Sequence, residues 1–163
     1  MDILCFTVFF IENKATWVLQ ASNVCYGAKG NTQGRFKINK EGLLIGLKLV
    51  HKSGYLTCDV KYPAFNSRWG CATRRSDWET LNVMTTISNI WRTKIFPNQK
   101  KTQLAVDGET ADNLVFTNSV DPIYTESGTE LHVWFTEDME DVSEHDNGGR
   151  HCVDVYAKFR KIS

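Results

Sequence analysis

Hydrophobic and β-branched side chains recur at every second position in several segments, and this alternation constrains the fold more than any other feature. Segments 45–50, 81–88 and 153–160 show it most clearly. Successive side chains of a β-strand point to opposite faces of the sheet, so each segment has one face for a core and one for water. The alternation therefore predicts half-buried strands of antiparallel sheets.

Shorter segments of strand-like composition bring the expected number of strands to about ten. No segment of sufficient length has the apolar periodicity of an amphipathic helix, and glycine-containing turns such as Gly27–Asn31 separate the candidates. We therefore predict an all-β protein, an antiparallel β-sandwich or jelly roll of about ten strands. The shorter candidates are 17–20, 24–26, 35–38, 55–60, 94–96, 103–106 and 114–117.

Length and charge limit the classes of function. A chain of 163 residues is of the size of one domain. Nineteen basic and nineteen acidic residues cancel, so the chain lacks the overall positive field that draws proteins to nucleic acid or anionic lipid. No apolar run is long enough to span a membrane as a helix. We expect neither a nucleic-acid partner nor a membrane span.

The N-terminal segment 1–21 has two interpretations. Residues 3–11 form an apolar run of the length of a signal-peptide core, and the same residues would also make a first β-strand. Residues 22–163 are expected to form a single β-sandwich domain. A cleaved signal peptide would direct the protein to a secreted or extracellular location.

The cysteines also favour an extracellular protein. Five are present, and Cys5 lies in the N-terminal apolar run, which leaves four for the domain and three ways of pairing them. We predict a disulfide-stapled fold, because disulfides persist in oxidising compartments. The favoured pairs are Cys58 with Cys71 and Cys25 with Cys152.

A dense acidic stretch separates two strand candidates, 131–135 and 152–159, which we expect to pair as a hairpin. Calcium takes several oxygen ligands from carboxylates, amides and carbonyls, so this stretch is a candidate calcium site. A solvated acidic loop is the alternative, because the spacing does not match an EF-hand. The candidate metal ligands are Asp138, Glu140, Asp141, Asp146 and Asn147.

The connection that follows residue 61 combines aromatic, amide and guanidinium groups, a mixture suited to sugars. An aromatic ring stacks on the apolar face of a pyranose while polar side chains hold its hydroxyls. The alternative is that Trp69 packs as core beside the disulfide and that Trp134 faces a second covered surface. The candidate ligand-binding residues are Tyr62, Asn66, Arg68, Trp69 and Trp134.

Enzyme signatures are absent from the sequence: there is no Gly-x-Ser-x-Gly, no His-Glu-x-x-His and no phosphate-binding loop. We therefore expect a binding protein rather than an enzyme. The leading hypothesis is an extracellular recognition module that binds glycan with the assistance of calcium, as lectins do. A protein-interaction or extracellular-matrix module and a glycan hydrolase are the alternatives. The sequence leaves the oligomeric state open.

Overall fold

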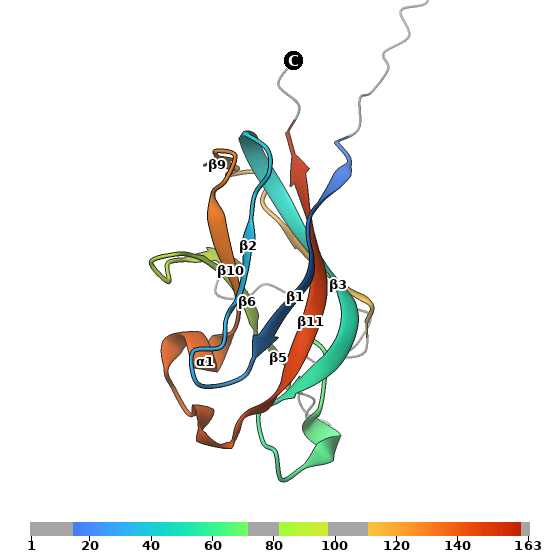
Figure 1. The fold of residues 1–163 in the computed structure, drawn as a ribbon, viewed down its shortest axis with the longest axis vertical. Helices are drawn as coiled ribbons and strands as arrows, with labels where there is room; N and C mark the ends of the chain where they lie inside the picture. Colours follow the sequence, from blue (N-terminus) through green and yellow to red (C-terminus); the bar gives the residue numbers. More distant parts are fainter. Residues whose placement is uncertain (1–14, 72–81, 98–110, 161–163) are drawn as a thin grey trace, which may run out of the picture.

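A computed structural model describes residues 15–71, 82–97 and 111–160 of the chain, and Figure 1 shows that these residues form layered antiparallel sheets with very little helix. The short helical segments are α1 (Thr136–Glu140) and two 3₁₀ turns, Pro63–Phe65 and Glu144–Asp146. The strands are β1 (Trp17–Gly27), β2 (Gly34–Lys37), β3 (Gly42–Thr57), β4 (Gly70–Cys71), β5 (Asn82–Val83), β6 (Thr85–Asn89), β7 (Lys94–Phe96), β8 (Asn113–Thr117), β9 (Ile123–Thr125), β10 (Glu130–Phe135) and β11 (Gly148–Phe159).

Two sheets pack face to face. The first has the strand order β1-β11-β3-β8, with β9 also paired to β3, and the second has the order β2-β10-β6-β7. The core lies between them, where the inward-facing side chains of the long strands β3 and β11, such as Leu47, Leu49 and Val155, are fully buried. The expected antiparallel all-β fold of about ten strands is therefore confirmed.

Two bulges in the pairing of β3 with β11 change which side chains of β3 face the core. Register shifts occur between Cys152 and Val153 and between Lys158 and Phe159. A bulge inserts an extra residue into one strand and reverses the alternation beyond it. β3 continues past the predicted segment 45–50 as one strand, and residues 52–55 are exposed before Leu56 returns to the core.

The predicted hairpin of residues 131–135 with 152–159 is wrong. β10 pairs with β2 and β6 in one sheet, whereas β11 pairs with β1 and β3 in the other. The connection between β10 and β11 contains α1 and the 3₁₀ turn Glu144–Asp146, and it crosses from one sheet to the other. The acidic stretch therefore bridges the two layers of the sandwich (Figure 1).

Both predicted disulfides are present. Cys25 of β1 is bonded to Cys152 of β11, its register partner, and Cys58 is bonded to Cys71. The first links two neighbouring strands, and the second closes the connection that follows β3.

The N-terminal prediction meets the structure only in part. Residues 17–21, assigned to the N-terminal segment, belong to β1 and pair with β11. Residues 1–14, with Cys5, and the predicted strand 103–106 lie outside the described residues. Among the helices of the described ranges, none has both the length and the apolar character needed to cross a membrane.

Candidate functional site

The acidic connection between β10 and β11 holds a neighbouring loop, residues 28–32, which we call the 28–32 loop. Asp138 is 1% exposed, and its two carboxylate oxygens accept the backbone N–H groups of Asn31 at 2.7 Å and Thr32 at 2.9 Å. Glu144 accepts the N–H of Gly30 at 3.0 Å. Hydrogen bonds to ionised acceptors are the stronger kind, so these carboxylates fix the backbone of the loop.

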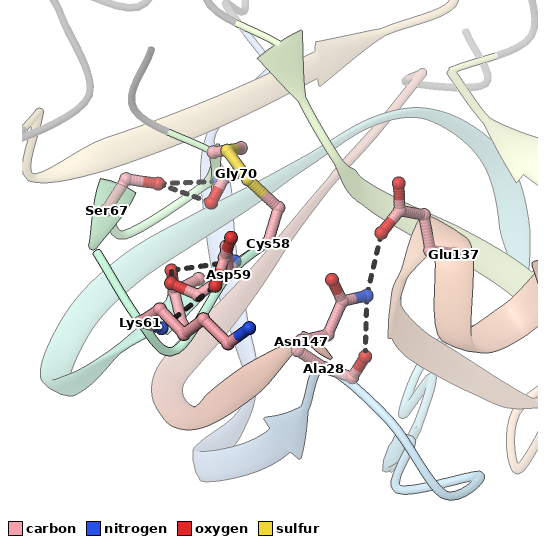
Figure 2. The surroundings of a disulfide bond; sticks show 10 residues. Ala28, Cys58, Asp59, Lys61, Ser67, Gly70, Glu137 and Asn147 are labelled. Atoms are coloured by element: carbon pink, nitrogen blue, oxygen red, sulfur yellow. Dashed lines mark hydrogen bonds between the residues drawn. A yellow bond between two sulfur atoms is a disulfide. The ribbon is translucent and has the colours of Figure 1, made fainter. Parts of the chain in front are cut away.

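Asn147 completes this support from the start of β11. Its side-chain nitrogen donates to the carbonyl of Ala28 at 3.2 Å and to Glu137 Oε2 at 2.7 Å, as Figure 2 shows. Asn147 is fully buried, and its Oδ1 has no hydrogen-bond partner among the described residues. Burial raises the pKa of the Glu137 carboxyl. The hydrogen bond from Asn147 lowers this pKa, and the nearby carboxylates of Asp146 and Glu140 raise it further.

The five candidate metal ligands have different environments. Asp138 and Asn147 are buried, Asp146 is half-buried, and Glu140 and Asp141 are exposed. Within the described ranges, no group of three or more histidine, cysteine, aspartate or glutamate side chains is placed to hold a metal ion. The hydrogen bonds instead give Asp138 and Asn147 a structural role in supporting the 28–32 loop.

A groove lies beside this loop, where β1 ends and β11 begins. Its volume is about 510 Å³, and it is lined by residues 25–29, 32, 33 and 148–150. The loop wall is rigid, because the N–H of Gly27 donates to the carbonyl of Thr32 at 2.9 Å and Thr32 Oγ1 donates to the carbonyl of Lys29 at 2.8 Å. Gly149 has φ of 89°, and a Cβ at this position would lie 2.3 Å from the carbonyl oxygen of Tyr55. Only glycine fits there without strain.

Charged and aromatic side chains border the groove. Lys29 and Arg150 are exposed, and no acidic residue lines it. Arg150 pairs in register with Gly27 on one side and with Tyr55 on the other. Register partners carry their side chains on the same face of a sheet, so the Tyr55 ring, in a residue that is 48% exposed, lies next to Arg150 on the outer surface.

A chain of hydrogen bonds runs through the core behind the groove. His51 Nδ1 lies 2.8 Å from His151 Nε2, His151 Nδ1 lies 3.1 Å from the Tyr26 hydroxyl, and that hydroxyl lies 2.9 Å from Thr85 Oγ1. Thr85 donates to the carbonyl of Trp69. Each hydroxyl has one proton to give, so the chain runs in one direction, with both histidines neutral and protonated on Nδ1.

The surroundings of the two histidines keep them neutral. Burial is the main cause of a pKa of about 3 for His151, and repulsion from His51, when that ring is protonated, and from Arg68 lowers it further. Burial and Arg68 also lower the pKa of His51, although Asp112 acts in the opposite direction.

The predicted sugar-binding residues are divided between core and surface. Trp69 is 1% exposed, donates from Nε1 to the carbonyl of Ala111 at 2.7 Å, and meets the ring of His151 edge-on with 4.8 Å between centroids. Tyr62 is 55% exposed and lies 5.4 Å from the ring of Phe65. Asn66 and Arg68 are half-buried, and Arg68 forms an ion pair of 2.7 Å with Asp112.

Trp134 lies in the other sheet, apart from this loop. It is 1% exposed, donates to Ser88 Oγ at 2.9 Å, and is covered by the guanidinium of Arg92 at 4.9 Å from the ring centroid. The structure thus brings Tyr62, Asn66 and Arg68 into one region but places both tryptophans in packed surroundings.

Sequence reasoning missed the groove and the residues that border it, Lys29, Tyr55 and Arg150. The signal that could have found them is the set of glycines at 27, 148 and 149, which allow backbone to approach closely. Their meeting in space depends on the register of β1, β11 and β3, which the sequence pattern does not specify.

Comparison with known proteins gives one informative likeness. No protein-family model matches the sequence, and no curated protein matches it. Among solved structures, the chain is similar to AJLec from the sea anemone Anthopleura japonica, with a TM-score of 0.78 and 28% sequence identity over 89% of this chain and 98% of that one. The fold is therefore lectin-like, and this likeness together with the two disulfides is consistent with an extracellular location.

Proposed function

We propose that the protein is an extracellular glycan-recognition module and that the groove between the 28–32 loop and the start of β11 is its binding site. The observation that carries the proposal is a groove of about 510 Å³ with an exposed aromatic residue, Tyr55, in register with Arg150 of its lining. Small-molecule sites are concave surfaces with a few well-placed polar groups. The lectin-like fold shared with AJLec supports the same class of ligand.

The chemistry of the groove suits a sugar. Tyr55 offers a ring face of the kind that packs on a pyranose, and Thr32 and Gln33 supply polar side chains in the lining. The anchoring of the loop by Asp138 means that little conformational freedom is lost on binding. The fixed polar loop would orient the sugar, and the nearby aromatic ring would add affinity.

Calcium assistance is the second element of the proposal. The buried Oδ1 of Asn147 has no partner among the described residues, and the carboxylates of Glu137 and Asp146 are close enough to influence one another. Calcium prefers such oxygens, and an ion there would strengthen the support of the 28–32 loop. Since a ligand that binds only the folded state raises the melting temperature, melting in millimolar calcium should occur above melting in chelator. Equal melting temperatures would remove calcium from the proposal.

A glycan array with matched variants tests the proposed site. Tyr55→Ala should weaken binding by about tenfold or more, the order of one aromatic contact, whereas Tyr55→Phe should retain it. Tyr124→Ala is the control, because Tyr124 is 56% exposed but lies on β9, which pairs with the opposite end of β3. An array without any bound glycan contradicts the proposed function and favours a protein-interaction module. Unchanged binding by Tyr55→Ala would place the site elsewhere.

A further inference from the structure

We propose that the groove selects acidic glycans, those that carry a carboxylate or a sulfate ester, over their neutral parents. The inference rests on the proposed function and names the class of sugar that the same site would take. It follows from the charges that line the groove, which differ from those of the chain as a whole.

The lining of the groove is positive although the chain has a net charge of zero. Lys29 and Arg150 line it and no carboxylate does. Neither cation takes part in the ion pairs formed within the described residues. Two cations without a protein counterion at one groove attract an anion, and the planar guanidinium of arginine can hold a carboxylate or sulfate through two parallel hydrogen bonds.

Two carboxylates that contact the 28–32 loop are engaged with its backbone. Asp138 and Glu144 accept the N–H groups of the 28–32 loop, and neither lines the groove. These carboxylates bind the backbone of the 28–32 loop, whereas Lys29 lines the groove. The carboxylates therefore position the wall of the groove and leave its cationic lining available to a ligand.

A third cation, Arg35, lies at the margin of the groove. The side chain of Gln33, which lines the groove, donates to the carbonyl of Asn31 at 2.6 Å and accepts from the guanidinium of Arg35 at 3.2 Å. Arg35 is exposed and lies at the start of β2. Its contact with Gln33 brings another positive charge to the margin of the groove, which strengthens the attraction for an anion.

The test compares N-acetyllactosamine with its sialylated and sulfated forms, measured by calorimetry on the intact protein. In about 20 mM salt the acidic forms should bind about tenfold or more tightly than the neutral parent, and about 300 mM salt should reduce this preference. The double variant Lys29→Gln, Arg150→Gln should lose the preference, so that it binds the two acidic forms no more tightly than the neutral parent. Its melting temperature should match wild type, because both side chains are exposed.

Controls separate local charge from total charge. Lys61→Gln removes an exposed lysine outside the groove and should keep the acidic preference. Arg150→Lys keeps the charge but loses the two-pronged hydrogen bonding, so its preference should be intermediate. Equal affinity of wild type for acidic and neutral sugars, or a preference that survives the double variant, overturns this inference and leaves the proposed function standing. Absence of binding to every sugar overturns both.

Discussion

The loop closed by the Cys58–Cys71 disulfide and the groove at the junction of β1 and β11 lie at the same end of the sandwich, since Thr57 pairs with Gly148. They differ in what their aromatic residues do. The loop contains several aromatic residues, but Trp69 is buried and Tyr62 packs near Phe65. The groove has an exposed aromatic residue, Tyr55, next to Arg150 of its lining, and strand register places it on the outer surface. An aromatic-rich segment is therefore a weaker sign of a binding surface than the position of a single ring.

One buried residue joins the two regions. The ring of His151 meets Trp69 of the loop edge-on, and its Nδ1 lies 3.1 Å from the hydroxyl of Tyr26, which lines the groove. Changes in the core behind either region therefore affect the stability of both. Substitutions of surface residues should affect one region without the other.

The largest expected effect is that of Trp69→Ala. Replacing a fully buried tryptophan leaves a cavity and removes the hydrogen bond to Ala111, so the free energy of unfolding should fall by about 3–5 kcal/mol. Denaturant unfolding measures this. Trp91→Ala is the control, because Trp91 is 80% exposed and should change stability by less than about 1 kcal/mol. If Trp69→Ala kept full stability but lost glycan binding, the loop would be the sugar site.

Acid should lower the free energy of unfolding through His151, the buried residue that contacts both regions. The pKa of His151 is about 3 in the folded state against 6.5 in the unfolded chain. The unfolded state therefore takes up a proton first, and stability falls as the pH decreases below 6.5 towards 3. The free energy of unfolding should be lower at pH 5 than at pH 8 by roughly 2 kcal/mol from this residue. Unfolding curves at several pH values should show this slope in wild type, and His151→Gln should reduce it.

His145→Gln is the matched control for this pH dependence, because the His145 side chain is 85% exposed. It should keep the wild-type slope. A His151→Gln variant with an unchanged slope would mean that other groups govern the acid response.

Asp138→Asn should affect the groove, through the 28–32 loop, and should leave the loop closed by the Cys58–Cys71 disulfide unchanged. An asparagine accepts one of the two backbone N–H groups that Asp138 accepts and presents its own amide to the other. The free energy of unfolding should fall by about 1–2 kcal/mol. Hydrogen exchange at the amides of Asn31 and Thr32 should become faster. Asp141→Asn changes an exposed residue with φ of 56°, which asparagine tolerates, so it should leave both measurements unchanged. Equal effects of the two substitutions would contradict the structural role of Asp138.

The sequence predicts much of the fold because alternation is a local signal and because four cysteines can pair in only three ways. The alternation of residues 45–50 and 153–160 reflects the core faces of β3 and β11. The favoured pairing of Cys25 with Cys152, one of three that four cysteines allow, is the one present in the structure. The alternation does not predict which strands pair. The same alternation fits any partner that buries the same face, which explains why 131–135 and 152–159 were expected to form a hairpin although they lie in separate sheets.

The groove also depends on strand pairing, so the sequence did not predict it. It is formed where residues 25–33 and 148–150 meet, and the nearby Tyr55 faces outward only because a bulge near Cys152 reverses the alternation of β3. Acidic residues were equally ambiguous, since composition does not distinguish a carboxylate that binds a metal from one that caps a loop. Asp138 accepts two backbone N–H groups, a role visible only when the 28–32 loop is placed beside it.

The smallest expected effect is that of Tyr62→Ala, and it sharpens the comparison most directly. Tyr62 is the most exposed aromatic of the predicted sugar-binding loop, and its ring lies 5.4 Å from the ring of Phe65. Surface substitutions of this kind change the free energy of unfolding by about 0.5 kcal/mol or less. If the groove binds the sugar, Tyr62→Ala should also leave glycan affinity unchanged, whereas Tyr55→Ala should lower it. The opposite pattern on the same array would assign the sugar to the loop, because both tyrosines are about half exposed and differ mainly in their location.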